Sequence, residues 1–185
     1  MKIYTKTGDS GQTGLYRGQR VSKDSLRISA IGDADETCAF LGLVLTEELP
    51  EQIATILTRI QGELFCLGAE LASEDPSAAG TNFLTLAHIG QMESEIDSLE
   101  ERLPQMTAFI LPGGSKAGGL LHVARAVCRR LERTIVGLKQ SDTGASMEIA
   151  IQYVNRLSDL LFVMSRSVNQ HLGRQEITWN APKVS

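Results

Sequence analysis

The strongest candidates for chemistry are four arginines and one glutamate within nine residues, in the segment Arg125-Ala-Val-Cys-Arg129-Arg130-Leu-Glu132-Arg133. At about 100° per residue of helix, Arg125, Arg129, Glu132 and Arg133 fall within roughly 100° of arc. Such a cationic face repels itself unless anions lie nearby, and the planar guanidinium binds phosphate oxygens through two parallel hydrogen bonds. The pattern favours a phosphate site, with a solvated surface carrying an arginine–glutamate pair as the alternative.

Glycine and threonine recur through the first 30 residues, where Gly8, Gly11, Gly14 and Gly18 stand among Thr, Lys, Asp, Ser and Gln. No helical stripe runs through this segment, and residues 21–31 lack a strand alternation. One interpretation is a floppy terminus. The other is an ordered loop whose backbone N–H groups and hydroxyls surround a phosphate chain.

Two weaker polar groups follow. Asn155, Arg156 and Asp159 lie in an otherwise apolar segment, as ligand contacts or as hydrogen-bonding groups between helices. Residues 112–116, Pro-Gly-Gly-Ser-Lys, form either an anion nest at a helix N-terminus or a simple tight turn. They are not a P-loop, because the required Gly-Lys-Ser/Thr spacing is missing.

Residues for conventional catalysis are lacking. His88, His122 and His171 have no glutamate three residues earlier, which argues against a di-iron bundle. There is no Gly-x-Ser-x-Gly elbow, and no CxxC pair indicates a zinc site. No metal-ligating residue is therefore expected. A reaction whose nucleophile comes from a bound molecule fits this pattern.

The elements that position these residues are expected to be helices, because apolar residues recur at steps of three and four. The first helix is expected to begin near Asp33, with Glu36 completing a capping box. A fourth begins after residues 112–114 with Ser115 as its N-cap, and a turn near Gly144 leads to the fifth. The five apolar stripes run over residues 38–49, 53–71, 89–103, 120–138 and 147–168. The fold class is all-α, a five-helix bundle.

The chain has 185 residues and a net charge of −4. That length fits one domain, which we divide into an N-terminal loop segment (1–30), a helical bundle (31–172) and a tail (173–185). The net charge argues against nucleic-acid binding. The polar start and the lack of an apolar run of ~20 residues predict a cytoplasmic protein with no membrane contact.

Five separated motifs resemble those of the PduO-type ATP:cob(I)alamin adenosyltransferases, in the same order along residues 3 to about 166. Any one motif would be weak, but together they are specific. The matching segments are residues 3–13 (Ile-Tyr-Thr-Lys-Thr-Gly-Asp-Ser-Gly-Gln-Thr), 32–36 (Gly-Asp-Ala-Asp-Glu), 109–114 (Phe-Ile-Leu-Pro-Gly-Gly), 125–133 and 153–159 (Tyr-Val-Asn-Arg-Leu-Ser-Asp).

This resemblance implies a homotrimer of five-helix bundles with its sites between subunits. Asp35 would pair across the interface with Arg125, and Phe109 would lie beneath the corrin ring. The resemblance implies an ATP site lined by Thr5, Lys6, Thr7, Gly8, Thr13, Gly14 and Lys23, completed from the neighbouring subunit by Arg129, Arg130, Glu132, Arg133 and Asn155.

The implied reaction is attack of cob(I)alamin on the 5′-carbon of ATP, with triphosphate as the leaving group and magnesium on the phosphates. An external reductase would supply the electron, and a cobalamin-dependent enzyme could accept the product. One departure is Cys38, where the family often has Asn, and the tail with Trp179 lies outside the motifs. Two alternatives remain open, another nucleotide-dependent transferase or kinase, and a regulatory bundle that senses ATP.

Overall fold

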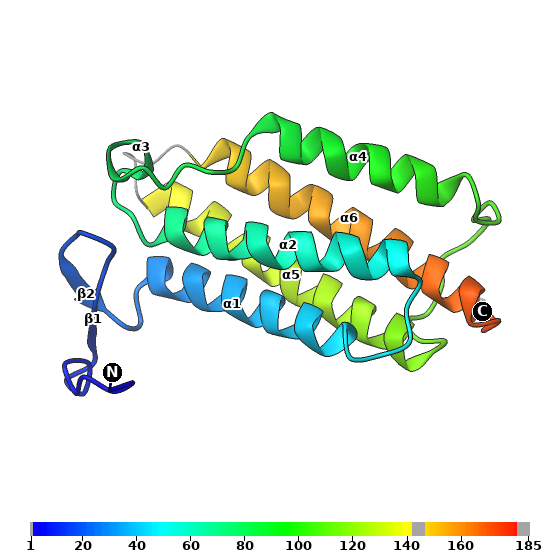
Figure 1. The fold of residues 1–185 in the computed structure, drawn as a ribbon, viewed down its shortest axis with the longest axis horizontal. Coiled ribbons are helices and arrows are strands. Elements are labelled where there is room, and N and C mark those ends of the chain that lie inside the picture. The colour runs from blue at the N-terminus through cyan, green and yellow to red at the C-terminus, as the bar shows by residue number, and fades with distance from the viewer. Residues whose placement is uncertain (1, 142–146, 181–185) are drawn as a thin grey trace, which may run out of the picture.

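The structure is a computed structural model that describes residues 2–141 and 147–180. Within them, six helices and one two-stranded sheet are present, and the five long helices run alongside one another as a bundle (Figure 1). The expected all-α bundle is confirmed, while the turn near Gly144 lies outside the described residues. The elements are β1 (Gln12–Gly14), β2 (Arg20–Ser22), α1 (Leu26–Val44), α2 (Glu51–Leu71), α3 (Pro76–Ala79), α4 (Leu86–Glu100), α5 (Lys116–Ser141) and α6 (Glu148–His171).

The core lies where the apolar stripes meet. Helix α5 packs between α1 and α6, α2 packs on α1, and α4 packs on α6. Leu41, Leu57, Leu131 and Leu157 are completely buried there. Each of the five long helices therefore turns an apolar stripe inward and leaves its polar face outside. No helix within the described residues is long and apolar enough to cross a membrane.

The expected start of the first helix at Asp33 is wrong. Helix α1 begins at Leu26, and the side chain of its N-cap Ser25 accepts a hydrogen bond from the Ile28 amide. Asp33 lies well inside the helix, where its carboxylate accepts a hydrogen bond from Thr134 of α5 at 2.7 Å. The bundle therefore begins about five residues before the boundary expected at residue 31.

The N-terminal segment contains a small hairpin that the sequence pattern did not indicate. Strands β1 and β2 pair antiparallel, with Thr13 opposite Val21. The hairpin projects from one end of the bundle (Figure 1), and the segment that joins α4 to α5 lies at the opposite end with the C-terminal tail. This arrangement determines which parts of the site a single chain can bring together.

Candidate functional site

A groove of about 600 Å³ lies between α4, α5 and α6. Arg125 and Arg129 of α5 line one wall, as the helical spacing predicted. Arg156 and Asp159 line it from α6, and Glu93 is one of the acidic side chains that α4 adds. The groove thus joins two of the motif segments at one surface.

The groove is lined by three arginines and four carboxylates, yet only one of the arginines is paired in the part of the chain that the structure describes. Arg156 donates hydrogen bonds to Glu93 and Asp159, each at 3.0 Å. Within the described residues, Arg125 and Arg129 form no ion pair, and the buried Nε of Arg125 has no hydrogen-bond partner. Burial and the neighbouring Arg129 lower the pKa of Arg125 from its ordinary value. An anion bound at this edge would accept a hydrogen bond from Arg125 and would offset the repulsion between the two arginines.

The remaining residues of the arginine segment face other partners. Arg130 donates through Nε to Asp33 at 2.8 Å and also pairs with Glu36, so it joins α5 to α1. Glu132 accepts a hydrogen bond from the Asn155 amide at 3.0 Å. Arg133 is exposed. The five charged residues of this segment therefore have different surroundings in the isolated chain.

The N-terminal loop makes hydrogen bonds within itself. The Arg20 guanidinium donates to the carbonyl oxygens of Thr7 at 2.6 Å and Gln12 at 3.1 Å, while the Thr5 and Thr7 hydroxyls lie 2.9 Å apart. Lys6 adopts a left-handed backbone with φ of 61°, a strained conformation that clusters at ligand-binding sites.

One lysine and one glycine of this loop also lie close together. A Cβ atom added to Gly8 would lie 3.0 Å from Lys23 Nζ, so this ammonium lies directly against the glycine backbone. Gly14 has open space where a Cβ would stand, and Thr13 is half-buried. The loop thus presents bare backbone, hydroxyls and ammonium groups together.

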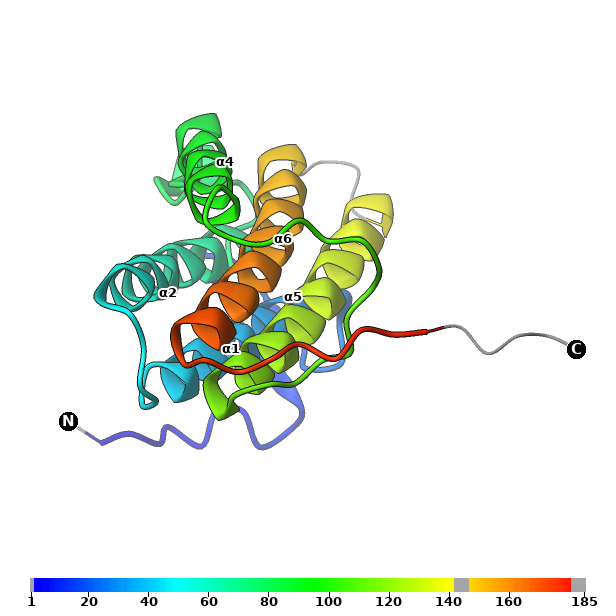
Figure 2. The ribbon, with the colours of Figure 1, turned by 90° about the vertical axis from the view of Figure 1, so that its right-hand side faces the viewer.

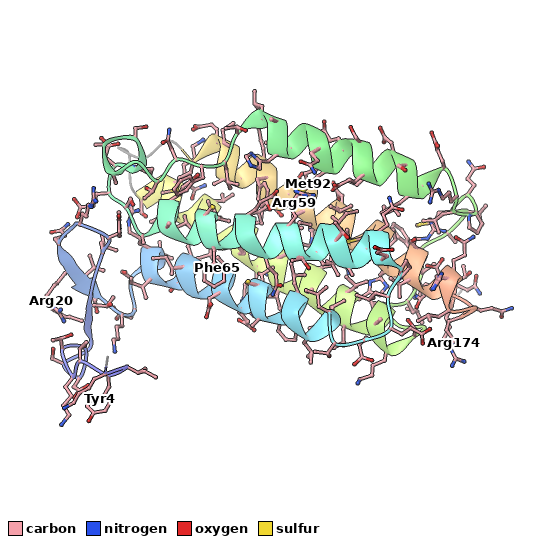
Figure 3. The ribbon with its side chains drawn as sticks, viewed as in Figure 1. Tyr4, Arg20, Arg59, Phe65, Met92 and Arg174 are labelled. Atoms are coloured by element: carbon pink, nitrogen blue, oxygen red, sulfur yellow. The ribbon has the colours of Figure 1, made fainter. Side chains whose placement is uncertain are left out.

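Two other expected site residues lie apart from this loop. The Phe109 side chain is 75% exposed, in the segment at the far end of the bundle. Asp35 is exposed beside an apolar hollow of about 430 Å³ between α1 and α2. The hollow is bordered by Phe65, which is 71% exposed and is labelled in Figure 3 on the side where α1 and α2 face the viewer. Asp35 forms no ion pair with Arg125 within the described chain.

One chain cannot bring the whole expected site together. Tyr4 and Arg20 mark the N-terminal loop at one end of the molecule in Figure 3, and Arg174 marks the opposite end. Trp179 of the tail hydrogen-bonds to Phe109 at that opposite end. The N-terminal loop and the Phe109 segment therefore lie at opposite ends of the bundle.

Several contributing residues were missed at the sequence level. Arg20 holds the loop backbone, and Glu93 neutralises Arg156. Their roles depend on long-range pairing, which local periodicity does not reveal. Among the described residues, no cluster of three or more His, Cys, Asp or Glu side chains is arranged to hold a metal ion.

Comparisons with known proteins identify the family. The family model described as "Cobalamin adenosyltransferase" matches residues 3–168. A cobalamin adenosyltransferase of Cupriavidus metallidurans is 44% identical over 185 residues, covering 100% of this chain and 97% of the relative. A corrinoid adenosyltransferase of Bacillus subtilis is 42% identical over 188 residues, covering 100% and 95%.

A solved structure gives the same result. It is a variant of the PduO-type ATP:corrinoid adenosyltransferase from Lactobacillus reuteri complexed with cobalamin and ATP, with a TM-score of 0.91 and 31% identity. The match covers 97% of this chain and 100% of that one. The bundle, the arginine groove and these similarities agree, and the chain belongs to the cobalamin adenosyltransferase family.

Proposed function

We propose that this chain transfers the 5′-deoxyadenosyl group of ATP to the cobalt of cob(I)alamin, at sites formed between subunits of a homotrimer. The observation that carries the interface is the separation of the N-terminal loop from the Phe109 segment, at opposite ends of one bundle (Figure 1). A second copy is needed to bring complementary parts together. Adenosylcobalamin and inorganic triphosphate are the products.

The proposed nucleotide site combines residues from two copies. Oriented backbone amides in loops bind phosphate anions, and arginine guanidinium groups add charge-assisted bonds. One copy would supply the N-terminal loop, and its neighbour the face of α5 and α6. The residues we assign to ATP are Thr5, Lys6, Thr7, Gly8, Thr13, Gly14 and Lys23 of one copy and Arg129, Arg130, Glu132, Arg133 and Asn155 of the other.

The reaction requires no protein base, because reduced cobalt is itself the nucleophile. As the bond from cobalt to the 5′-carbon forms, the bond from that carbon to the triphosphate oxygen breaks, and negative charge grows on the leaving group. Lys6, Lys23 and Arg129 would stabilise that charge, and a magnesium ion bound to the triphosphate would add to it. Positive groups fixed in advance lower the barrier where charge develops.

Phe109 would act on the other substrate. Its exposed aromatic ring would cover the lower face of the corrin and exclude an axial water. Four-coordinate cob(II)alamin accepts an electron more readily than the five-coordinate form. The electron comes from an external reductase, and the product would pass to a cobalamin-dependent enzyme. This use of ATP and a strong reductant fits a cytoplasmic location.

Asp35 and Arg125 would join the copies. Asp35 lies at the edge of the apolar hollow with exposed Phe65, and Arg125 is half-buried with no ion-pair partner within the described residues. Exposed apolar surface beside an unpaired charge is typical of an interface. An ion pair between Asp35 of one copy and Arg125 of another would give each charge a partner.

Co-expression of two inactive variants tests the shared site. Lys6→Ala removes the loop ammonium, and Arg129→Ala removes the helix arginine. Mixed trimers contain some interfaces in which both residues are intact, so activity should return above that of either variant alone. A site within one chain would give no recovery. Mixing the parent with magnesium-ATP and cob(II)alamin should also produce the four-coordinate spectrum, which a simple ATP sensor or a kinase would not change.

A further inference from the structure

We infer that the C-terminal segment 176–179, anchored by Arg166, is a positioning element that fixes the Phe109 segment in place before any substrate binds. This inference rests on the proposed role of Phe109 at the corrin. The segment lies outside all five motifs, and its role is inferred from the structure alone.

The tail pairs with the Phe109 segment through its backbone. The Trp179 amide donates to the Phe109 carbonyl at 2.7 Å, and the Leu111 amide donates to the Ile177 carbonyl at 2.8 Å. Ile110 and Thr178 lie opposite each other as an antiparallel bridge between these bonds. In Figure 2 the tail passes beside the segment that leads from α4 to α5. The two bonds flank Ile110, and the first is accepted by the carbonyl of Phe109 itself, the residue that carries the ring.

Arg166 of α6 anchors both strands of this pair. Its side chain is only 6% exposed. Nη2 donates to the Pro104 carbonyl at 2.9 Å, near the start of the Phe109 segment. Nε donates to Glu176 at 3.1 Å, at the start of the paired tail. One buried guanidinium therefore sets the distance between the two chain segments. Hydrogen bonds donated by a charged group are stronger than those between neutral groups.

Asn169, one turn further along α6, secures the other end of the Phe109 segment. Its amide donates to the Gly113 carbonyl at 2.9 Å and accepts from the Ser115 amide at 2.8 Å. A Cβ on Gly114 would lie 2.4 Å from Asn169, and φ there is 95°, so glycine is required. The segment is held at its start, its middle and its end.

This support matters because the Phe109 ring has little packing of its own. The side chain is 75% exposed, so the ring's position depends on the backbone that carries it. A backbone fixed in advance avoids the entropy cost of ordering it when a ligand binds. The tail thus acts on cobalt coordination through Phe109.

The test compares two variants at one position. Trp179→Ala and Trp179→Pro both remove the indole, but only proline also removes the amide that donates to Phe109. Without substrates, hydrogen exchange of the Leu111 amide should be roughly three- to ten-fold faster in Trp179→Pro than in Trp179→Ala, the fold-change expected from one hydrogen bond. With magnesium-ATP, the equilibrium constant for four-coordinate cob(II)alamin should fall by a similar factor.

ATP affinity, measured by titration, separates the possible results. Equal exchange and equal four-coordinate yield in the two variants would overturn the inference. A loss of ATP affinity specific to Trp179→Pro would overturn it too, because the tail would then support the nucleotide site. If the parent itself forms no four-coordinate cob(II)alamin with ATP, the proposed function fails, and the exchange measurement still decides whether the tail holds the segment.

Discussion

Arg130 donates through Nε to Asp33 Oδ1 at 2.8 Å and so joins the middle of α5 to α1. Its Nη2 pairs with Glu36. Arg129, the next residue, lines the groove on the α6 side and forms no ion pair within the described residues. Two adjacent arginines with the same charge therefore have different surroundings, because consecutive helical positions differ by about 100°.

Arg129→Ala should remove activity while leaving a folded assembly. Losing a contact to the leaving triphosphate should lower kcat/KM roughly 100- to 1,000-fold, the scale of one donor in an oxyanion hole. Steady-state kinetics with reduced cobalamin and thermal unfolding check both parts. Near-normal kcat/KM would reject the assignment.

Arg130→Ala should instead change both activity and stability. The variant loses the link to Asp33 and Glu36, which should cost about 0.5–1 kcal/mol in the free energy of unfolding, because the pair is partly solvated. Urea unfolding of Arg129→Ala and Arg130→Ala side by side measures the difference. Equal unfolding free energies would contradict the structural role of Arg130.

Asp35→Asn and Arg125→Ala should have matching effects on assembly. If the two residues form a buried pair between copies, removing one partner leaves a charge unpaired at a cost of roughly 3–5 kcal/mol. Sedimentation of the two single variants and the double variant completes a double-mutant cycle. Strictly additive losses in trimer stability would count against a direct pair.

The accuracy of the sequence predictions depended on the continuity of each apolar stripe. Helix α2, Glu51–Leu71, matches the apolar stripe predicted over residues 53–71, because that stripe is unbroken from Ile53 to Leu71. The start of helix α1 was predicted too late in the sequence, because buried Arg27 interrupts its apolar stripe. The Arg27 guanidinium donates to the carbonyls of Leu71 and Ser73 at 2.8 and 2.9 Å, so it serves the end of α2 instead.

The site was predictable where its residues are close in sequence. The spacing of Arg125 and Arg129 placed both on one face of α5, and Ser115 was correctly predicted as the N-cap, accepting from the Gly118 amide at 2.9 Å. The three-residue strands are too short to show an alternation. The pairing of Phe109 with Trp179 joins segments 70 positions apart, and periodicity carries no signal for such contacts.

Buried His122 should make stability depend on pH. Burial, and then the nearby Arg125 charge, lower its pKa from 6.5 to about 4. The unfolded chain therefore binds a proton more readily, so this contribution is complete above pH 6.5 and is lost as the pH falls through 4. It should be worth roughly 2 kcal/mol, since solvent screening reduces the full value of 1.36 kcal/mol per pKa unit.

His122→Gln tests this assignment, because glutamine retains an amide that can reach Ser165, the partner of His122 Nε2 at 3.2 Å. Urea unfolding at pH 7 and pH 4.5 gives the pH-dependent difference for each protein. The parent should lose more stability than the variant over that interval. An identical loss in both proteins would assign the pH dependence to other groups.

Phe109→Ala should separate nucleotide binding from cobalt activation. The ring is exposed and belongs to no apolar stripe, so its removal should leave the free energy of unfolding within about 0.5 kcal/mol of the parent. ATP affinity should also be retained, because Lys6, Lys23 and Arg129 lie on other segments. Water would instead enter beneath the corrin, keep cobalt five-coordinate and hold its reduction potential low. Two measurements on the variant separate these effects. An ATP titration gives the nucleotide affinity, and the cob(II)alamin spectrum with ATP present gives the cobalt coordination. A full four-coordinate yield in the variant would disprove the axial role, and a loss of ATP affinity would place Phe109 in the nucleotide site instead.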